Sequence, residues 1–340
     1  MSIIHIEDIA HVRFSAPDLD AMARFLRDFG LICFEADGRL YGHGRDAAPY
    51  LHVTELGKPA FRALGLRAES VADLQRLAER TGTLVEPLHT PGGGHVVRLH
   101  DPDDNLVEVV AGQAPRTAEP APDEAPFNAA SSRRRLRSPV RLQPGAAHVQ
   151  RLGHAVLNVR DFERSERWYK ERFGFITSHE IEAAPGASIG AFLRVNRGAT
   201  PTDHHTLFLL QLPAPGPPLN HAAFEVAGLD DLMLGHSHLR ARGRQLAWGV
   251  GRHKLGSQIF DYWKDPWGNE LEHWTDGDLF TAADGSEKAS LRELLEVQWG
   301  AVFPKLAGRH APSPETIAKA VALMLRLQRW FRTPNKGAAT

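Results

Sequence analysis

The sequence predicts an α+β protein made of two successive copies of one module, followed by a helical tail. The first observation is an internal repeat: residues 9–31 and residues 152–175 share the order of an alternating strand and an aromatic-rich helix. The second is a stretch between them, residues 113–145, that is rich in Pro, Ala, Ser and charge, as linkers are.

Each repeat opens on a strand that carries a histidine, His11 in the first and His154 in the second. An aspartate precedes the helix that follows, which ends in Phe-Gly. Gly30 and Gly174 suit the position just after a helix, where a positive φ is needed. The strand–helix order restarts within each module, at residues 61–82 and again after Leu219.

The repeats also end alike. The first closes with HDPDDNLVEVV and the second with KDPWGNELEHW. In both, Asp-Pro opens a turn, an Asn follows, and a strand then carries a glutamate, Glu108 or Glu272. We therefore expect a module at residues 1–112, a linker at 113–145 and a second module at 146–282.

The remaining residues, 283–340, are expected to form a helical extension. Ser313, Pro314 and Glu315 are a typical helix start, and Pro334 would end the helix. One apolar face would be formed by Ile317, Val321, Met324, Leu327 and Phe331. This helix is expected to pack on the second module or on another subunit.

The composition points away from several classes of partner. The formal net charge is -1, so neither nucleic acid nor a membrane surface is expected as a partner. The single cysteine, Cys33, cannot form an internal disulfide, which fits the cytoplasm. Neither a signal peptide nor a transmembrane segment is expected from the sequence.

The second module contains three candidate metal ligands, His154, His221 and Glu272. They lie on its first strand, on the strand that restarts the pattern and on its last strand. If these strands are neighbours in one curved sheet, their side chains converge on one face. Two His and one carboxylate leave adjacent coordination positions open, the arrangement expected for non-haem Fe(II).

The segments LGHAVLNV, LNHAAFEV and YWKDPWGNELEHW resemble the three ligand segments of type I extradiol dioxygenases, in the vicinal oxygen chelate superfamily. The last segment matches through Tyr262, Pro266, Gly268 and Glu272. The resemblance implies two tandem vicinal oxygen chelate modules, each of paired βαβββ units that form a curved mixed sheet. It also implies Fe(II) rather than Mn(II), a catecholic substrate, O₂ and a homo-oligomer.

The same resemblance assigns roles outside the metal ligands. An acid–base histidine is expected before the second ligand, where this chain has His204 and His205. We prefer His205 because its spacing fits better, although the loop before His221 is one residue longer than expected. His253 and Tyr262 fall where the family places groups that hydrogen-bond the substrate oxygen.

The first module lacks a complete ligand set. His11 and Glu108 are present, but Phe61, Arg62 and Ala63 stand where the second histidine would fall. We therefore expect no metal in this module and structural roles for His11 and Glu108.

The function expected is Fe(II)-dependent extradiol (meta) cleavage of a catecholic ring with insertion of both atoms of O₂, in aromatic-compound degradation. One alternative is a 4-hydroxyphenylpyruvate dioxygenase-like 2-oxo-acid oxygenase, which would use the same ligands. The other is a non-catalytic aromatic-compound-binding protein of the same fold. His205, His253 and Tyr262 argue against the first alternative, and the complete ligand set argues against the second.

Overall fold

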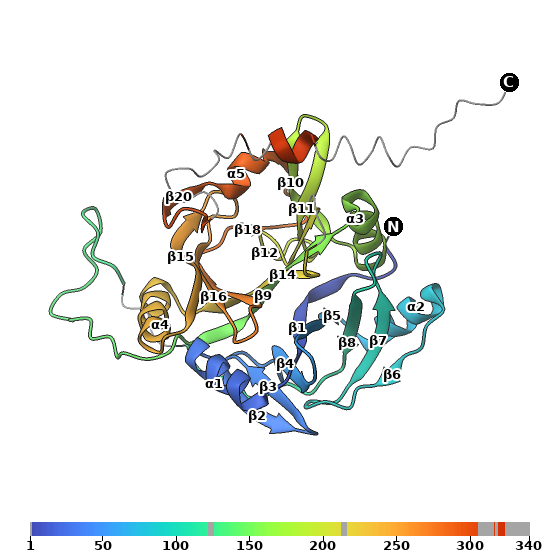
Figure 1. Ribbon diagram of the computed structural model, residues 1–340, viewed down its shortest axis with the longest axis horizontal. Coiled ribbons are helices and arrows are strands. Elements are labelled where there is room, and N and C mark those ends of the chain that lie inside the picture. Colours follow the sequence, from blue (N-terminus) through green and yellow to red (C-terminus); the bar gives the residue numbers. More distant parts are fainter. Residues whose placement is uncertain (1, 122–125, 212–215, 305–315, 317–318, 324–340) are drawn as a thin grey trace.

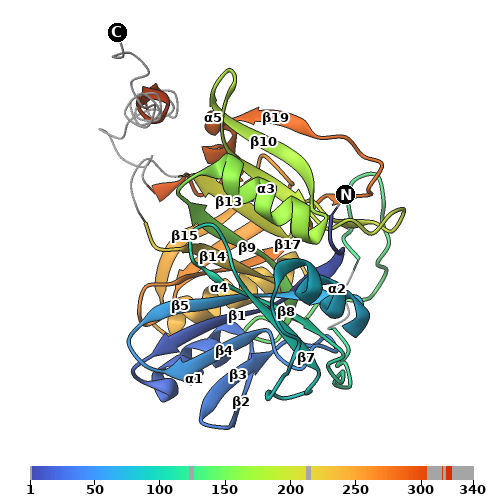
Figure 2. The ribbon, with the colours of Figure 1, turned by 90° about the vertical axis from the view of Figure 1, so that its right-hand side faces the viewer.

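The computed structural model describes residues 2–121, 126–211, 216–304, 316 and 319–323. Two large mixed sheets organise the chain, and Figures 1 and 2 both show the blue-to-teal first module below the green-to-orange second module. Within the described ranges, no helix has the length and apolar character that crossing a membrane requires.

Module one is an 8-stranded sheet in the order β2-β3-β4-β1-β5-β8-β7-β6. Its elements are β1 (Ile6–Ala16), α1 (Leu19–Phe29), β2 (Ile32–Ala36), β3 (Arg39–His43), β4 (His52–Leu56), β5 (Ala60–Ala68), α2 (Val71–Thr81), β6 (Glu86–Pro87), β7 (His95–His100) and β8 (Leu106–Ala111).

Module two is a 10-stranded sheet in the order β19-β10-β11-β13-β9-β14-β17-β16-β15-β20, with a small β12-β18 ribbon beside it. Its elements are β9 (Val149–Val159), α3 (Phe162–Phe173), β10 (Ile176–Ala184), β11 (Ala187–Arg194), β12 (Thr202–Asp203), β13 (Leu207–Gln211), β14 (Leu219–Val226), α4 (Leu229–Ala241), β15 (Gln245–His253), β16 (Ile259–Lys264), β17 (Glu270–Thr275), β18 (Leu279–Phe280), β19 (Glu287–Ser290), α5 (Leu291–Leu295) and β20 (Val297–Gly300).

The duplicated order of one strand, one helix and three main strands confirms the expected paired βαβββ units. In each module the two units meet through antiparallel first strands, β1 with β5 and β9 with β14. The last strand then lies parallel to the restarting strand, β8 beside β5 and β17 beside β14. This arrangement makes β9, β14 and β17 neighbours, which is what the candidate metal ligands require.

The ends of the first helix of each module follow the sequence pattern. The side chains of Asp18 and Asp161 accept hydrogen bonds from backbone N–H groups of α1 and α3. Gly30 and Gly174 follow these helices with φ of 104° and 71°. Residues with a side chain rarely adopt this left-handed conformation, so both glycines were placed correctly from sequence.

The Asp-Pro turn that precedes the last strand has the same structure in both modules. In module two, Oδ1 of Asp265 accepts hydrogen bonds from the backbone N–H of Trp267 and Asn269, and the Asn269 amide donates to Oδ2. In module one, Asp101 holds Asn105 in the same way. The turn therefore sets where the glutamate-bearing strand begins.

The segment after residue 282, for which the sequence predicted a helical extension, contains strands as well as helices. Strand β19 pairs with β10 and strand β20 pairs with β15, so both join the edges of the module-two sheet. These two short strands are stabilised by pairing with strands that are distant in the sequence. Local sequence patterns do not reveal such pairing. Residues 319–323 are helical, and Val321 is buried in a cluster with Leu291 of α5. The other expected tail positions lie outside the described residues.

The two modules share one continuous apolar core. Phe29 of α1 stacks on the ring of His273 at 3.8 Å, and its carbonyl accepts a hydrogen bond from that imidazole. Asp28 lies 3.3 Å from Nε2 of His238 and forms an ion pair with Arg244, both in module two. Module one therefore supports the back of the strand that carries Glu272.

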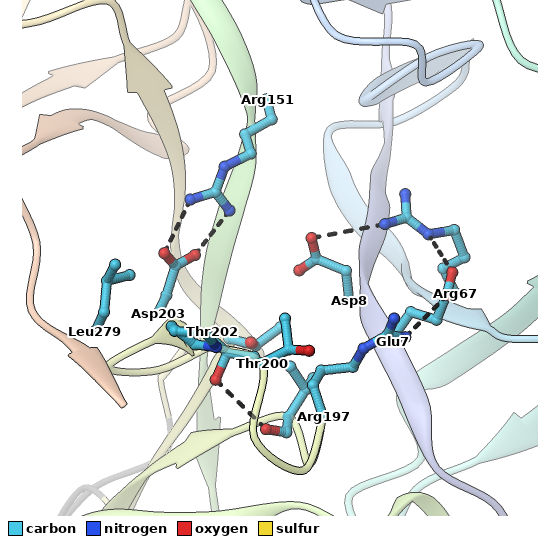
Figure 3. A pocket seen from close by; sticks show the side chains of 12 residues that line it. Glu7, Asp8, Arg67, Arg151, Arg197, Thr200, Thr202, Asp203 and Leu279 are labelled. Atoms are coloured by element: carbon cyan, nitrogen blue, oxygen red, sulfur yellow. Dashed lines mark hydrogen bonds and ion pairs between the residues drawn. The ribbon is translucent and has the colours of Figure 1, made fainter. Parts of the chain in front are cut away.

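A polar cavity of about 370 Å³ lies between the modules. Figure 3 shows Arg151 of β9 bound through both terminal nitrogens to the carboxylate of Asp203, at 2.7 and 2.9 Å. Asp8 and Arg67 of module one face this pair across the cavity. The Arg151–Asp203 contact ties β12, and the residues that follow it, to the central strand of module two.

Close packing at Gly153 of β9 gives a first prediction. A Cβ there would lie 2.4 Å from Cζ2 of Trp274, which is buried. Gly153→Ala should therefore lower the free energy of unfolding by about 1 to 3 kcal/mol, measured from urea denaturation. The control is Gly145→Ala in the linker, where a Cβ would meet no described atom within 4 Å. Equal denaturation midpoints for the two variants would contradict this packing.

Candidate metal centre

Three neighbouring strands bring the predicted ligands to one point. Ala223 of β14 is paired with His154 of β9 on one side and with Glu272 of β17 on the other. His221 lies two residues before Ala223, so its side chain points to the same face of the sheet. The spacing of the ligands is thus a direct result of strand register.

The ligand atoms are close enough to share one ion. Nε2 of His154 lies 3.2 Å and Nε2 of His221 lies 3.3 Å from Oε2 of Glu272. All candidate ligand atoms lie within 4.8 Å of one another, and no other cluster of His, Cys, Asp or Glu in the described part of the chain meets this criterion.

The carboxylate of Glu272 is buried, yet neither of its oxygens accepts a hydrogen bond from a described residue. It is fully shielded from solvent, and neither oxygen has a hydrogen-bond partner among the described residues despite the nearby imidazoles. Buried polar groups are rarely left in this state. The carboxylate oxygens of Glu272 and the ring nitrogens of His154 and His221 lie close together without hydrogen bonds between them. The residues present therefore fit a bound metal ion.

Electrostatics keep Glu272 ionised. Burial raises the pKa of its carboxyl, but His154, His221 and His253 outweigh burial and hold the pKa well below its usual range. Burial lowers the pKa of His154, although Glu272 opposes this shift. A carboxylate beside a neutral imidazole is the protonation state in which both groups can bind a divalent cation.

His253 and Tyr262 lie beside the ligands, as the sequence predicted. Nε2 of His253 is 3.0 Å from the hydroxyl of Tyr262 and 3.6 Å from Oε1 of Glu272. Burial, reinforced by the charge of Glu272, raises the pKa of Tyr262 well above its usual value. Tyr262 is therefore a phenol and a hydrogen-bond donor throughout the ordinary pH range.

His204 and His205 follow β12 but have different surroundings. His205 lines the cavity in front of the ligands, and its ring lies 4.0 Å from that of His154. His204 is buried behind it and does not line this cavity. Burial lowers the pKa of His205 well below its usual value, so this imidazole is neutral.

The cavity in front of the ligands is also lined by residues outside the predicted ligands and acid–base groups. Phe192 and Phe208 form one wall, and Trp248 stacks on Tyr262 with ring centroids 5.3 Å apart. Asn220 accepts a hydrogen bond from Nδ1 of His221 at 2.9 Å, which leaves Nε2 of that ring directed to the site. In the sequence, the only indication of this role for Asn220 is its position directly before His221 in LNHAAFEV.

The equivalent position in module one contains arginines. Gly65 of β5 is paired with both His11 and Glu108, as Ala223 is with its neighbours, so Ala63 occupies the place of His221. Glu108 accepts a hydrogen bond from His11 at 3.1 Å. Arg13 and Arg98 lie 3.3 and 3.1 Å from its other oxygen. The charge of Glu108 is thus balanced by the chain itself.

Comparison with known proteins agrees with this geometry. The sequence pattern of the Glyoxalase/Bleomycin resistance protein/Dioxygenase superfamily matches residues 151–273, which contain all the candidate ligands. Metapyrocatechase 2 of Cupriavidus necator is 30% identical over 310 residues, covering 88% of this chain and 91% of that protein. An iron-dependent extradiol dioxygenase of Rhodococcus jostii (strain RHA1) is 26% identical, covering 80% of this chain and 90% of that protein.

The fold agrees as well. The Mn(II)-bound glyoxalase of Novosphingobium aromaticivorans superposes with a TM-score of 0.72 at 24% identity, covering 90% of this chain and 96% of that one. The fold and the match to the superfamily define a tandem vicinal oxygen chelate protein. Within that superfamily, this chain belongs to the type I extradiol ring-cleaving dioxygenases.

The arginines of module one give a prediction about pH. Burial raises the pKa of Glu108, but the hydrogen bond from His11 and the charges of Arg13 and Arg98 outweigh it and lower the pKa from 4.5 to about 2. The ionised carboxylate therefore stabilises the fold above pH 4.5, and this stabilisation is lost as the pH falls from 4.5 towards 2.

The measurement compares the free energy of unfolding of the wild type with that of Glu108→Gln across this pH range. The wild type should be more stable by on the order of 3 kcal/mol at neutral pH, and the difference should shrink below about pH 4.5. Glu79→Gln, at an exposed position of α2, controls for removing one carboxylate. A difference that is constant with pH would show that Glu108 is not held as a carboxylate by its neighbours.

Proposed function

We propose that this protein is an Fe(II)-dependent dioxygenase that opens a catecholic ring beside its hydroxyl groups and incorporates both atoms of O₂. The observation that carries the proposal is the set of His154, His221 and Glu272 around one point, with His205, His253 and Tyr262 at its open side. A facial set of ligands from the protein leaves room for a bidentate substrate and for O₂.

Iron is favoured over manganese by the nearer relatives. The relative from Rhodococcus jostii is named as iron-dependent, while the Mn(II)-bound structure resembles this chain in fold alone. When bound, the divalent ion would act as a Lewis acid that lowers the pKa of a coordinated hydroxyl and would bring substrate and O₂ together.

The side chains around the ligands have separate roles in substrate binding and in proton transfer. Tyr262, which stays protonated, can donate a hydrogen bond to an ionised substrate oxygen. His253, 3.0 Å from that phenol, orients it. His205 is neutral, so it can accept the proton of the second substrate hydroxyl and later return it.

The cavity favours a catechol with an apolar substituent. Beyond the histidines, Tyr262, Asn220 and Gln258, its described lining is apolar and contains no Lys, Arg, Asp or Glu. Leu294 and Leu295 of α5, together with Phe303, add to this apolar lining. A charged substituent would lose its hydration there without gaining a partner.

The function is tested by adding catechols and air to the Fe(II)-loaded protein. Extradiol cleavage predicts a yellow ring-opened product and one O₂ consumed per catechol. A catechol with an alkyl substituent should be turned over with a higher kcat/KM than one with a carboxymethyl group of matched length. Release of CO₂ from a 2-oxo acid, or binding of catechol without turnover, would support one of the two alternative functions instead.

The ligand assignment predicts loss of metal. Glu272→Ala and His221→Ala should each reduce the iron retained after dialysis from about one per chain to a small fraction, because the site has no spare protein ligand. His11→Ala, at the equivalent position of module one, is the matched control and should retain iron. Wild-type iron content in correctly folded Glu272→Ala protein would refute the assignment.

The assignment of His205 predicts loss of turnover without loss of metal. His205→Phe should keep its iron and its affinity for catechol, while kcat falls by about 10² to 10⁴-fold, the usual effect of removing an acid–base group. His52→Phe is the control, since His52 is also fully buried but lies in module one. An unchanged kcat in His205→Phe would remove His205 from the reaction.

A further inference from the structure

A chain of histidines leads from the cavity to the protein surface. Nδ1 of His205 lies 3.0 Å from Nδ1 of His204, and Nε2 of His204 lies 2.7 Å from Nδ1 of His179 on β10. Nε2 of His179 is 3.6 Å from the carboxylate of Glu287. The parallel pairing of β10 with β19 sets His179 directly opposite Glu287.

The chain is enclosed along most of its length. Phe192 packs against the rings of both His204 and His205, and Phe280 packs against His204 from another side. The backbone N–H of His204 donates to the carbonyl of Asp278, which fixes the residue further. Exposure begins at His179, whose side chain is 14% exposed, and Glu287, with 83% of its side chain exposed, reaches the solvent.

Enclosure keeps these imidazoles neutral. Burial lowers the pKa of His204 to about 3, and burial also lowers the pKa of both His205 and His179. A neutral imidazole has one N–H and one lone pair, so each contact between two rings holds a single proton. The position of the proton on one ring therefore decides its position on the next.

Glu287 decides the direction of the whole chain. The negative charge of Glu287, 3.6 Å from Nε2 of His179, favours a proton on that nitrogen. Nδ1 of His179 is then an acceptor for Nε2–H of His204. Nδ1 of His204 in turn accepts from Nδ1–H of His205. The remaining nitrogen of His205, Nε2, is left with a lone pair.

We propose that His179 and His204 are positioning residues that, oriented by Glu287, hold His205 in the tautomer with a proton on Nδ1 and a lone pair on Nε2. In this form His205 is ready to accept a proton from a bound ligand. The catalytic part of this inference rests on the proposed function, whereas the tautomer itself does not.

The tautomer is measured by ¹⁵N NMR of full-length protein labelled at histidine and loaded with Zn(II), a diamagnetic ion. Comparison with His205→Phe assigns the His205 signals. The wild type should show a protonated Nδ1 and an unprotonated Nε2 at His205. In His179→Leu, His204 loses its acceptor, its proton moves to Nδ1, and His205 should switch to the form protonated at Nε2.

His179→Asn is the conservative variant, because its side-chain carbonyl can accept from His204 and should restore the wild-type tautomer. His148, whose Nδ1 is 2.7 Å from Asp231, reports on correct folding in the same spectra. A wild-type His205 protonated at Nε2 would overturn the proposal, as would an unchanged His205 in folded His179→Leu. If His179→Leu does not fold, His179→Asn with Nε2 protonated would overturn it equally.

Steady-state kinetics of the Fe(II) forms separate this inference from the proposed function. His179→Leu should lower kcat by at least about 10-fold with little change in KM for catechol, and His179→Asn should recover most of the loss. If the tautomer of His205 switches but kcat does not fall, the control of the tautomer by His179 is supported and the role of His205 as a base is refuted.

Discussion

The candidate metal centre depends on the register of three strands, in which Ala223 of β14 is paired with both His154 and Glu272. A slip of one residue in either pairing would turn a ligand to the opposite face of the sheet. Several contacts hold the register: the Asp265 turn before β17, the close fit of Gly153 against Trp274, and the anchoring of β17 by Phe29.

The sequence was sufficient to predict the architecture and to select the residues that the structure brings together at the candidate centre. Strand periodicity and the repeated Asp-Pro turn located His154 and Glu272 on comparable strands, and the restart after Leu219 located His221. The duplication of the module made this prediction possible, because a strand or turn that was ambiguous in one module could be assigned by comparison with its counterpart in the other. The helix ends at Gly30 and Gly174 were predictable because their chemistry is local.

What could not be predicted depends on contacts between distant segments. Leu294, Leu295 and Phe303 reach the cavity only because β19 and β20 join opposite edges of the sheet. His179 precedes His204 by many residues and contacts it through the pairing of β10 with β11 and of β11 with β13. Short strands that are stabilised by their partners carry little signal of their own.

The two modules balance the same buried charge by different means. In module one, the guanidinium groups of Arg13 and Arg98 lie beside Glu108 and are permanent parts of the chain. In module two, Glu272 is surrounded by imidazoles, so its counter-charge is a proton or a metal ion taken from the surroundings. A cation that binds at Glu272 therefore couples its supply to the folding of this site. At the equivalent position of module one, the counter-charges of Glu108 are built into the chain itself.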